Sequence, residues 1–178
     1  MKLSKSKGFT LIEVIVVAGI IAILAGILVP MIFKEIDESK ITRASADIRS
    51  ISSAIFVFRK DIGQWPVMDN TCTANLTLLV GDGNVPNGAV AHGFDQTAQS
   101  SYNDHLPQDV NGCYANWKGP YIARISADPW GNAYITNAKE FSGTSDPVWI
   151  ISAGPNAVID TNNTDSQIAS DDIGLRLK

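Results

Sequence analysis

Gly8-Phe9-Thr10-Leu11-Ile12-Glu13 opens the stretch that decides the fold, and an uncharged apolar run from Val14 to Phe33 follows it. The run has 20 residues, which at about 1.5 Å of helix per residue can cross the roughly 30 Å hydrocarbon core of a bilayer. Glu13 stands at the start of this run, where a carboxylate is costly unless a partner neutralises it. The stretch therefore predicts a membrane-spanning helix, with Glu13 as a candidate functional residue.

The charges that flank the apolar run are distributed unequally. Lys2, Lys5 and Lys7 precede it, whereas the charges that follow are mixed in sign and begin at Lys34. Basic flanking residues stay on the cytoplasmic side of a membrane. We therefore expect a single-pass inner-membrane protein with its amino terminus in the cytoplasm and the rest of the chain exported.

The segment around Gly8 also carries a resemblance to a known family. A short basic leader that ends in glycine, followed by Phe-Thr-Leu-Ile-Glu and an apolar helix, resembles the class III signal of type IV pilins and pseudopilins. The resemblance implies that a prepilin peptidase cleaves between Gly8 and Phe9 and methylates the new amine of Phe9. It also implies that Glu13 is needed for filament assembly. An ordinary secretory signal differs, because its cleavage site follows the apolar segment and is flanked by small residues.

A physical role for Glu13 is consistent with that resemblance. Once Phe9 is the first residue, its amine is a cation in apolar surroundings, and a carboxylate on the same or a neighbouring chain can neutralise it. Such a pair would fix the axial register of packed helices, as a single polar residue does in a coiled coil. The alternative is that Glu13 lies solvated at the lipid headgroups and has no such role.

The composition of the whole chain is that of an exported, mildly acidic domain behind an anchor. The 178 residues and the net charge of -4 fit one compact domain and one helical anchor. The chain lacks a basic stripe interleaved with aromatic residues, which argues against a nucleic-acid partner. Cys72 and Cys113 suit a disulfide in an oxidising compartment such as a bacterial periplasm and are too few for a zinc site. Two free buried thiols are the alternative.

Beyond the apolar run, the helix is predicted to continue with one apolar face. Apolar residues recur there at spacings of three and four, which lines one side of a helix: Ile41, Ala44, Ile48, Ile51, Ile55, Phe58 and Ile62. Gly63, followed by Pro66, predicts the end of the helix. Inside the apolar run, Gly19, Gly26 and Pro30 weaken the helix. They predict either a bent or locally melted segment or a fixed kink.

The chain is predicted to form an α+β, pilin-like fold in which the long helix packs on a small C-terminal antiparallel sheet. Its parts are a leader at 1–8, a transmembrane or filament-core helix at 9–33, an amphipathic continuation at 34–63, a loop-rich insertion at 64–118, and a sheet with a C-terminal loop at 119–178. Ala133–Thr136 and Val148–Ser152 have the β-branched and aromatic content of strands, and turn residues at 142–147 separate them.

A second motif narrows the resemblance. Asp128-Pro129-Trp130-Gly131-Asn132 resembles a turn region of the major pseudopilins of type II secretion systems. The turn can also be interpreted physically: Asp128 accepts from backbone amides ahead of it, Pro129 presets φ, and Gly131 permits a positive φ. We therefore expect Asp128 to be structural, with Trp130 packed beneath the turn.

Two further segments resemble the C-terminal loop of the same family. They are Ile151-Ser152-Ala153-Gly154-Pro155-Asn156 and Ser170-Asp171-Asp172-Ile173-Gly174. In that family calcium closes the loop through acidic side chains and backbone carbonyls, so the resemblance implies a calcium site formed by Asn156, Asp171 and Asp172.

This sequence departs from the family pattern at that loop. Asn156 stands where the family usually has aspartate, and Ala157 stands where it usually has glycine. An amide oxygen can ligate calcium, but the site then loses one negative charge and some affinity. Asp160 and Asp165 can contribute instead. The alternative is a solvated acidic loop without a metal.

No enzyme is expected from the sequence. It lacks a phosphate-binding loop and a metal-dependent catalytic motif, and His92 and His105 stand in no such motif, so both are interpreted as surface or hydrogen-bonding residues. We expect instead a structural subunit of a helical pseudopilus of a type II secretion system, assembled from the inner membrane to drive protein export.

The expected partners follow from the same resemblance. They are further copies of the chain, prepilin peptidase, the inner-membrane assembly platform and minor pseudopilins. One alternative is a type IV pilin that forms a surface filament for adhesion or motility, although the cysteines of those pilins usually bracket the C-terminal region. The other is a membrane-anchored periplasmic domain that never polymerises.

Overall fold

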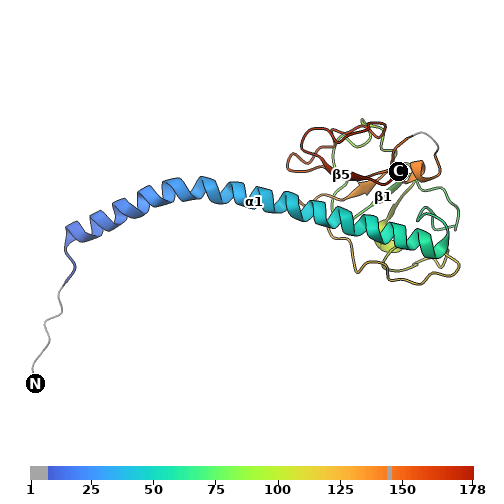
Figure 1. Ribbon diagram of the computed structural model, residues 1–178, viewed down its shortest axis with the longest axis horizontal. Helices are drawn as coiled ribbons and strands as arrows, with labels where there is room; N and C mark the ends of the chain where they lie inside the picture. The colour runs from blue at the N-terminus through green and yellow to red at the C-terminus, as the bar shows by residue number, and fades with distance from the viewer. Residues whose placement is uncertain (1–7, 144–145) are drawn as a thin grey trace, which may run out of the picture. The chain divides into compact units, whose positions relative to one another are not determined.

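The computed structural model describes residues 8–143 and 146–178. The predicted leader, apart from Gly8, and Thr144 and Ser145 of the predicted turn lie outside the described residues. The chain divides into two compact units, Met1–Ser39 and Lys40–Lys178. Helix α1, Leu11–Ile62, contributes residues to both units (Figure 1).

The described part of the first unit is helical from Leu11 onward, and all of its residues are exposed. The helix is continuous through Gly19, Gly26 and Pro30, so the structure has no melted segment at these positions. Its apolar part is long enough and apolar enough to cross a membrane. This confirms the predicted apolar helix.

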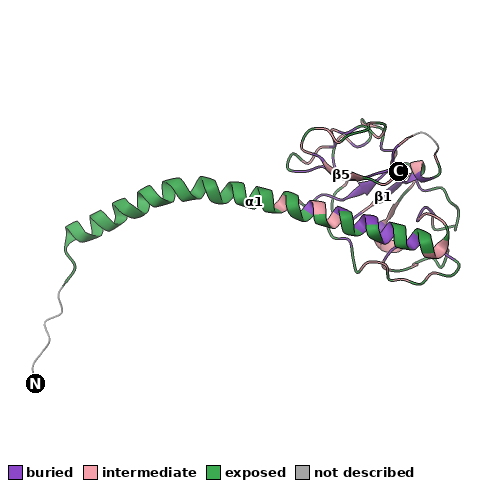
Figure 2. Ribbon diagram, in the orientation of Figure 1, coloured by how far each residue is buried: buried purple, intermediate pink, exposed green. Residues whose placement is uncertain are grey.

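The second unit begins where α1 starts to bury side chains. Figure 2 shows this change along the helix, and the predicted apolar face is confirmed. Its buried members are Ala44, Ile48, Ile51, Ile55 and Phe58. Ile41, at the start of the face, remains 41% exposed. The helix ends at Ile62, and Gly63 follows with φ +84, the left-handed conformation that glycine adopts at helix ends.

A five-stranded sheet forms the other layer of the second unit, with strand order β2-β1-β3-β4-β5. The strands are β1 Leu78–Val80, β2 Gln99–Ser101, β3 Ile135–Thr136, β4 Trp149–Ser152 and β5 Ile173–Arg176. All neighbouring pairs are antiparallel except β1 and β2, which are parallel. The described residues also form two short 3₁₀ helices, η1 Tyr102–Asp104 and η2 Ala138–Phe141.

The α+β, pilin-like fold class is confirmed, and the sheet is larger than the sequence predicted. Strands β3 and β4 lie inside the two predicted strand segments. Strands β1 and β2 come from the insertion at 64–118, which was predicted to be loop-rich, and their parallel pairing corrects the expectation of a purely antiparallel sheet. Strand β5 was not predicted.

Alternation along the strands divides the core into two clusters. Leu79 and Ile150 face α1 and pack with its buried residues, whereas Leu78, Ile135 and Ile151 face the opposite side. Loop residues such as Phe94 and Ile159 cover that second face. Because successive side chains point to opposite faces, the central strands β1 and β4 contribute to both clusters.

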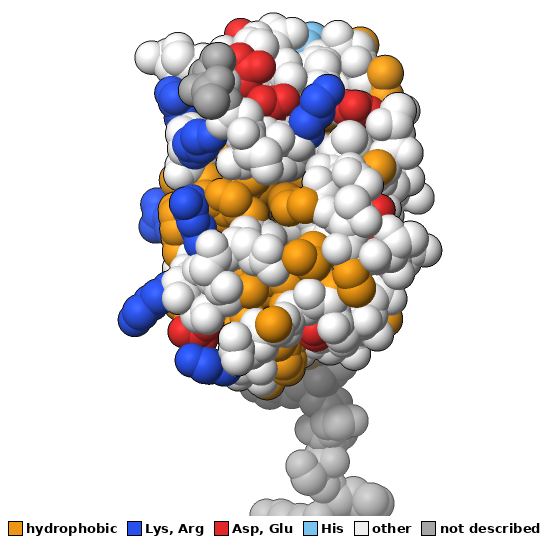
Figure 3. All heavy atoms as spheres, turned by 90° about the vertical axis from the view of Figure 1, so that its right-hand side faces the viewer, with side chains coloured by type: hydrophobic (Ala, Val, Ile, Leu, Met, Phe, Trp, Pro, Cys, Tyr) orange, Lys and Arg blue, Asp and Glu red, His pale blue; other side chains and the backbone are white. Residues whose placement is uncertain are grey.

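Aromatic residues close the core around the C-terminal end of α1. Trp65 stacks on Phe141 with 4.3 Å between ring centroids, and the Arg59 guanidinium lies 3.7 Å from the centre of the Trp65 ring. Figure 3 shows that side of the molecule, with hydrophobic side chains across its middle and Lys and Arg side chains gathered along one edge.

A disulfide joins two parts of the insertion, and an aromatic contact holds the insertion against the core. The predicted Cys72–Cys113 bond is present, with a sequence separation of 41. Tyr114, next to the second cysteine, packs edge-on against Phe58 of α1 at 4.8 Å. The bond therefore links the loop around Cys72 to the residue that precedes Tyr114.

His105 also lies in the insertion and is buried. Its Nε2 lies 2.9 Å from Ser100 Oγ and its Nδ1 lies 3.0 Å from the Tyr114 hydroxyl. Burial lowers the pKa of His105 to about 4, although Asp104 and Asp109 act in the opposite direction. The expectation of a hydrogen-bonding histidine is thus confirmed for His105. His92 Nδ1 lies 3.1 Å from Asn162 Oδ1.

Removal of the disulfide is expected to destabilise the protein. In the chain-entropy model, a bond across 41 residues contributes about 4 kcal/mol to the free energy of unfolding. We expect Cys72→Ala/Cys113→Ala to lower that free energy by a similar amount in urea titrations. The wild-type chain in reductant should match the double variant. A loss below about 1 kcal/mol would show that the bond does not stabilise the fold.

Acidification is expected to destabilise the protein through His105. The ordinary histidine pKa of about 6.5 applies to the unfolded chain, so the unfolded state gains the proton first as the pH falls. The stabilisation is complete above pH 6.5 and is lost toward pH 4. Between pH 7 and pH 5 we expect the free energy of unfolding to fall by about 2 kcal/mol through this group.

Two substitutions identify the histidine that is responsible. In His105→Gln, the contribution of this group to the pH dependence should disappear, whereas His92→Gln should retain it. The measurement is urea unfolding at a series of pH values. An equal pH dependence in His105→Gln and the wild type would contradict the assignment.

Candidate functional site

The first candidate site is the start of α1, where Thr10 and Glu13 cap the helix reciprocally. Glu13 Oε2 accepts hydrogen bonds from the Thr10 backbone N at 2.8 Å and from Thr10 Oγ1 at 2.7 Å. The Glu13 backbone N in turn donates to Thr10 Oγ1 at 3.4 Å. This is a capping box, which satisfies backbone donors that the first turn leaves unpaired.

The capping box lies directly after the predicted cleavage site. Gly8 and Phe9 immediately precede the helix and are exposed, as a cleavage site must be. The carboxylate of Glu13 is held against Thr10, one residue from the predicted new amine of Phe9. Thr10 was missed as a site residue, although the Thr-x-x-Glu pattern before an apolar run is a known signature of a capping box.

The residues next to Glu13 in the sequence are apolar, and in the single chain their side chains are uncovered. Leu11, Ile12 and Val14 are 77%, 69% and 57% exposed. Contiguous exposed apolar surface of this extent marks a membrane or protein contact. The site is therefore one carboxylate at the start of an apolar stretch of helix that is uncovered in the single chain.

The turn at Asp128 is structural, as predicted. Asp128 is buried, and its Oδ1 accepts from the backbone N of Trp130 at 3.0 Å and of Asn132 at 2.8 Å. Its Oδ2 accepts from Ser152 Oγ on β4 at 2.6 Å. Gly131 has φ +92, and the Trp130 ring packs against the core. The carboxylate thus ties the turn to the sheet.

The second candidate site is the C-terminal loop, in which Asn156 lies between two carboxylates. Asn156 Nδ2 donates to Asp160 Oδ2 at 3.0 Å and to Asp171 Oδ1 at 2.6 Å. The neighbouring Asp172 has different partners: its Oδ2 accepts from the backbone N of Asp160 and from both the N and Oγ1 of Thr161. Asp171 and Asp172 therefore do not bind a common partner.

Burial distinguishes Asp172 from the other carboxylates of the loop. It raises the pKa of Asp172 against the opposing effect of the hydrogen bonds from Thr161 and Asp160. The other oxygen, Oδ1, is buried without a hydrogen-bond partner. This oxygen is the only group at the loop whose environment suggests a missing ligand among the described residues.

The arrangement of the loop residues does not fit a calcium ion. Calcium takes six to eight oxygen ligands, and the described residues hold no group of three or more Asp, Glu, His or Cys side chains placed to share a metal. Asn156 directs N–H donors, which repel a cation, at the two nearest carboxylates. Calcium binding at Asn156, Asp171 and Asp172 stays a prediction.

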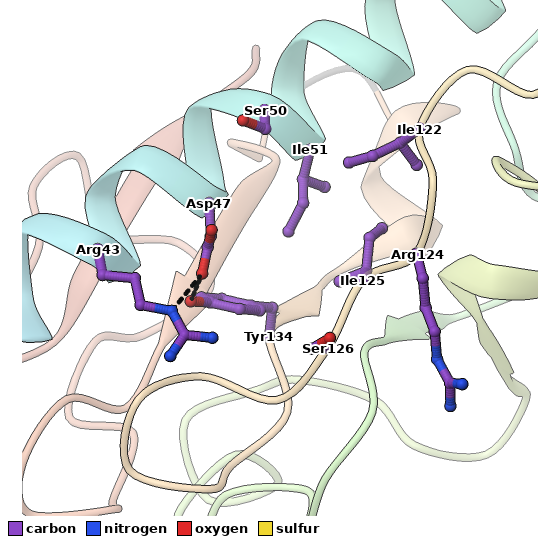
Figure 4. Close-up of a pocket in the computed structure, with 9 residues that line it drawn as sticks. All are labelled: Arg43, Asp47, Ser50, Ile51, Ile122, Arg124, Ile125, Ser126 and Tyr134. Atoms are coloured by element: carbon purple, nitrogen blue, oxygen red, sulfur yellow. Dashed lines mark hydrogen bonds and ion pairs between the residues drawn. The ribbon is translucent and has the colours of Figure 1, made fainter.

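A small cavity of about 110 Å³ lies between the second half of α1 and the segment at 122–126 (Figure 4). Its lining includes charged, hydroxyl and apolar side chains: Arg43, Asp47, Ser50, Ile51, Ile122, Arg124, Ile125, Ser126 and Tyr134. The Tyr134 hydroxyl donates to Asp47 Oδ2 at 3.0 Å, and Arg43 Nε lies 3.6 Å from the same oxygen. Three of the polar groups thus bind one another, whereas Arg124 pairs with Asp82, which does not line the cavity.

The contact between Ser100 and His105 is the arrangement in the described structure that most resembles a nucleophile with its base. A serine nucleophile needs a histidine that accepts its proton near neutral pH, oriented by a third group. Burial lowers the pKa of His105 to about 4, which makes it a weak base, and its other nitrogen contacts the Tyr114 hydroxyl in place of a carboxylate. These three side chains therefore do not form the serine–histidine–carboxylate arrangement of such a nucleophile.

Comparison with known proteins adds two family matches. Residues 3–29 match the prokaryotic N-terminal methylation motif, and residues 31–171 match the type II secretion system protein G family.

Curated relatives agree with the second match, and each is named type II secretion system core protein G. The relative from Pseudomonas aeruginosa is 26% identical over 96% of this chain and 98% of its own length. The one from Escherichia coli K12 is 29% identical over 89% and 88%, and the one from Aeromonas hydrophila is 31% identical over 75% and 74%. No solved structure matches the chain.

Proposed function

We propose a filament-forming function on the premise that the chain belongs to the type II secretion system protein G family. The chain is a structural subunit, the major pseudopilin of a pseudopilus. It is anchored in the inner membrane by its apolar helix until it is assembled, and the growing filament drives protein export. Prepilin peptidase prepares it by cleavage between Gly8 and Phe9 and methylation of Phe9.

The exposed apolar half of α1 is the observation that carries this proposal. Every described residue of the first unit is exposed, and the side chains from Val14 to Phe33 are uncharged. In the membrane, lipid tails cover this surface, and in a filament the same surface packs against other copies. Lipid tails and packed apolar helices are similar in polarity, so the free energy difference between the two states is set by packing and by the few polar groups.

Glu13 is the polar group that decides between the two states. In the single chain its carboxylate is satisfied by Thr10. In a bundle of apolar helices the carboxylate needs a cation, because an unpaired buried charge is strongly destabilising. The amine of Phe9 on a neighbouring copy supplies that cation, and the pair fixes the axial register of the helices.

The second unit supplies the outer surface of the filament. Its core is closed by α1 and the sheet, and its exterior carries the charges of the chain beyond Lys40. The assembly platform in the inner membrane and the minor pseudopilins are the further partners proposed for this subunit.

A surface pilus is the rival filament, and the disulfide argues against it. The Cys72–Cys113 bond closes before the Asp128 turn and leaves the C-terminal region unbracketed. A tethered domain that never polymerises would leave the single carboxylate and the Gly8-Phe9 boundary without a role.

Substitution of Glu13 tests the filament role. We expect Glu13→Ala to insert into the inner membrane as the wild type does, to form no filaments, and to stop export of the proteins that the host secretes through this system. Insertion persists because the substitution removes a charge from an apolar segment. Assembly fails because the Phe9 amine loses its counter-charge.

Glu35→Ala is the matched control, because Glu35 lies on the same helix just beyond the apolar run. It should support filaments and export. Membrane fractionation, crosslinking between neighbouring helices and the secreted protein yield are the readouts. Normal filaments from Glu13→Ala would refute the role. Long surface filaments on wild-type cells, together with export that does not change in Glu13→Ala, would favour the surface pilus.

A further inference from the structure

We propose that the side-chain amide of Asn156 closes the C-terminal loop in the place of a cation, so that this loop folds without a divalent metal. The loop runs from Gly154, at the end of β4, to Asp172, just before β5. Its two ends carry Asn156 and Asp171, which are 15 residues apart and hydrogen-bonded to each other.

Asn156 donates hydrogen bonds to both carboxylates that face it, those of Asp160 and Asp171. Nδ2 donates one bond to Asp160 Oδ2 at 3.0 Å and one to Asp171 Oδ1 at 2.6 Å. The Asn156 backbone N donates to the other oxygen of Asp171 at 3.0 Å. Asp171 is thus held by two donors from one residue. Hydrogen bonds to ionised carboxylates are stronger than neutral ones, so this pair is well placed to close the loop.

A fourth contact fixes the orientation of the amide. Asn156 Oδ1 accepts from the backbone N of Val158 at 2.7 Å. A reversed amide would direct Nδ2 at this donor and Oδ1 at two carboxylates, and all of these contacts would be repulsive. The N–H₂ group therefore faces Asp160 and Asp171, where it takes the electrostatic role that a cation would have.

The rest of the loop is held by interactions that also need no metal. Asp172 Oδ2 accepts from Thr161 N and Oγ1, both at 2.7 Å, and so fastens the middle of the loop to its end. Gly154 has φ +62, and a side chain there would collide with the backbone carbonyl of Asp171. The two ends therefore approach each other closely through backbone and side-chain contacts.

One oxygen of Asp172 favours closure of the loop by a metal instead. Asp172 Oδ1 is buried and has no hydrogen-bond partner. A cation that bound this loop would be expected to contact that oxygen, and calcium would then stabilise the wild-type protein. Calcium titration of the wild type therefore separates closure by the amide from closure by a metal.

The experiment measures the unfolding temperature of the full chain in detergent micelles, with EDTA or with excess calcium chloride. We expect the wild type to unfold at the same temperature in both. Asn156→Asp places a third carboxylate opposite Asp160 and Asp171, so in EDTA its unfolding temperature should fall by about 5 °C. Calcium should restore most of that loss, since three carboxylates then surround the position of the amide.

Asn162→Asp is the matched control. It adds the same charge to the same loop, but the amide of Asn162 contacts Asp165 and lies outside the Asp160–Asp171 pair. The unfolding temperature of Asn162→Asp should be the same in EDTA and in calcium chloride. The readout uses the isolated chain, so it does not depend on filament assembly.

Three results would overturn the proposal. They are a saturable rise in the unfolding temperature of the wild type with calcium, an Asn156→Asp variant as stable as the wild type in EDTA, and a loss in Asn156→Asp that calcium does not restore. The first result would show that a metal closes the loop. The second would show that the amide of Asn156 does not stabilise the loop. The third would show that the amide does not occupy the position of a cation.

Discussion

The need to neutralise one carboxylate in an apolar helix is the constraint on which the account of this chain depends. Glu13 lies between exposed apolar side chains, and among the described residues its charge is stabilised by the capping box with Thr10. That box is sufficient at a membrane interface, where water remains near. It is insufficient inside a bundle of apolar helices, where a cation is needed. Cleavage at Gly8 would create such a cation next to the carboxylate.

The two halves of α1 have different roles in the structure. Up to Ser39 the helix buries no described side chain within the chain itself, so its apolar surface depends on neighbours. From Ala44 onward one face packs on the sheet and forms the core of the second unit. The same helix thus carries the exposed apolar surface and part of the core of the C-terminal domain. The Cys72–Cys113 bond and the Asp128 turn hold the loops of that domain in place without contributing to the site at Glu13.

Local sequence patterns predicted the structural features that depend on neighbouring residues. They missed the features that depend on residues far apart in the chain. The buried face from Ala44 to Phe58, the stop at Gly63 and the Asp128 turn follow from spacing and turn chemistry, and the structure has all three. The parallel pairing of β1 with β2 depends on a contact across the insertion, which no short pattern encodes. The contact between Asn156 and Asp171 is another such case, because the two residues are 15 positions apart in the chain.

The mass of the subunit recovered from assembled filaments tests the central claim most directly, because it reports whether the amine that Glu13 needs exists. The account predicts a chain that begins at a methylated Phe9, with the leader through Gly8 absent. A subunit that still begins at Met1 while it polymerises and supports export would contradict the account, since Glu13 would then have no amine of Phe9 to neutralise.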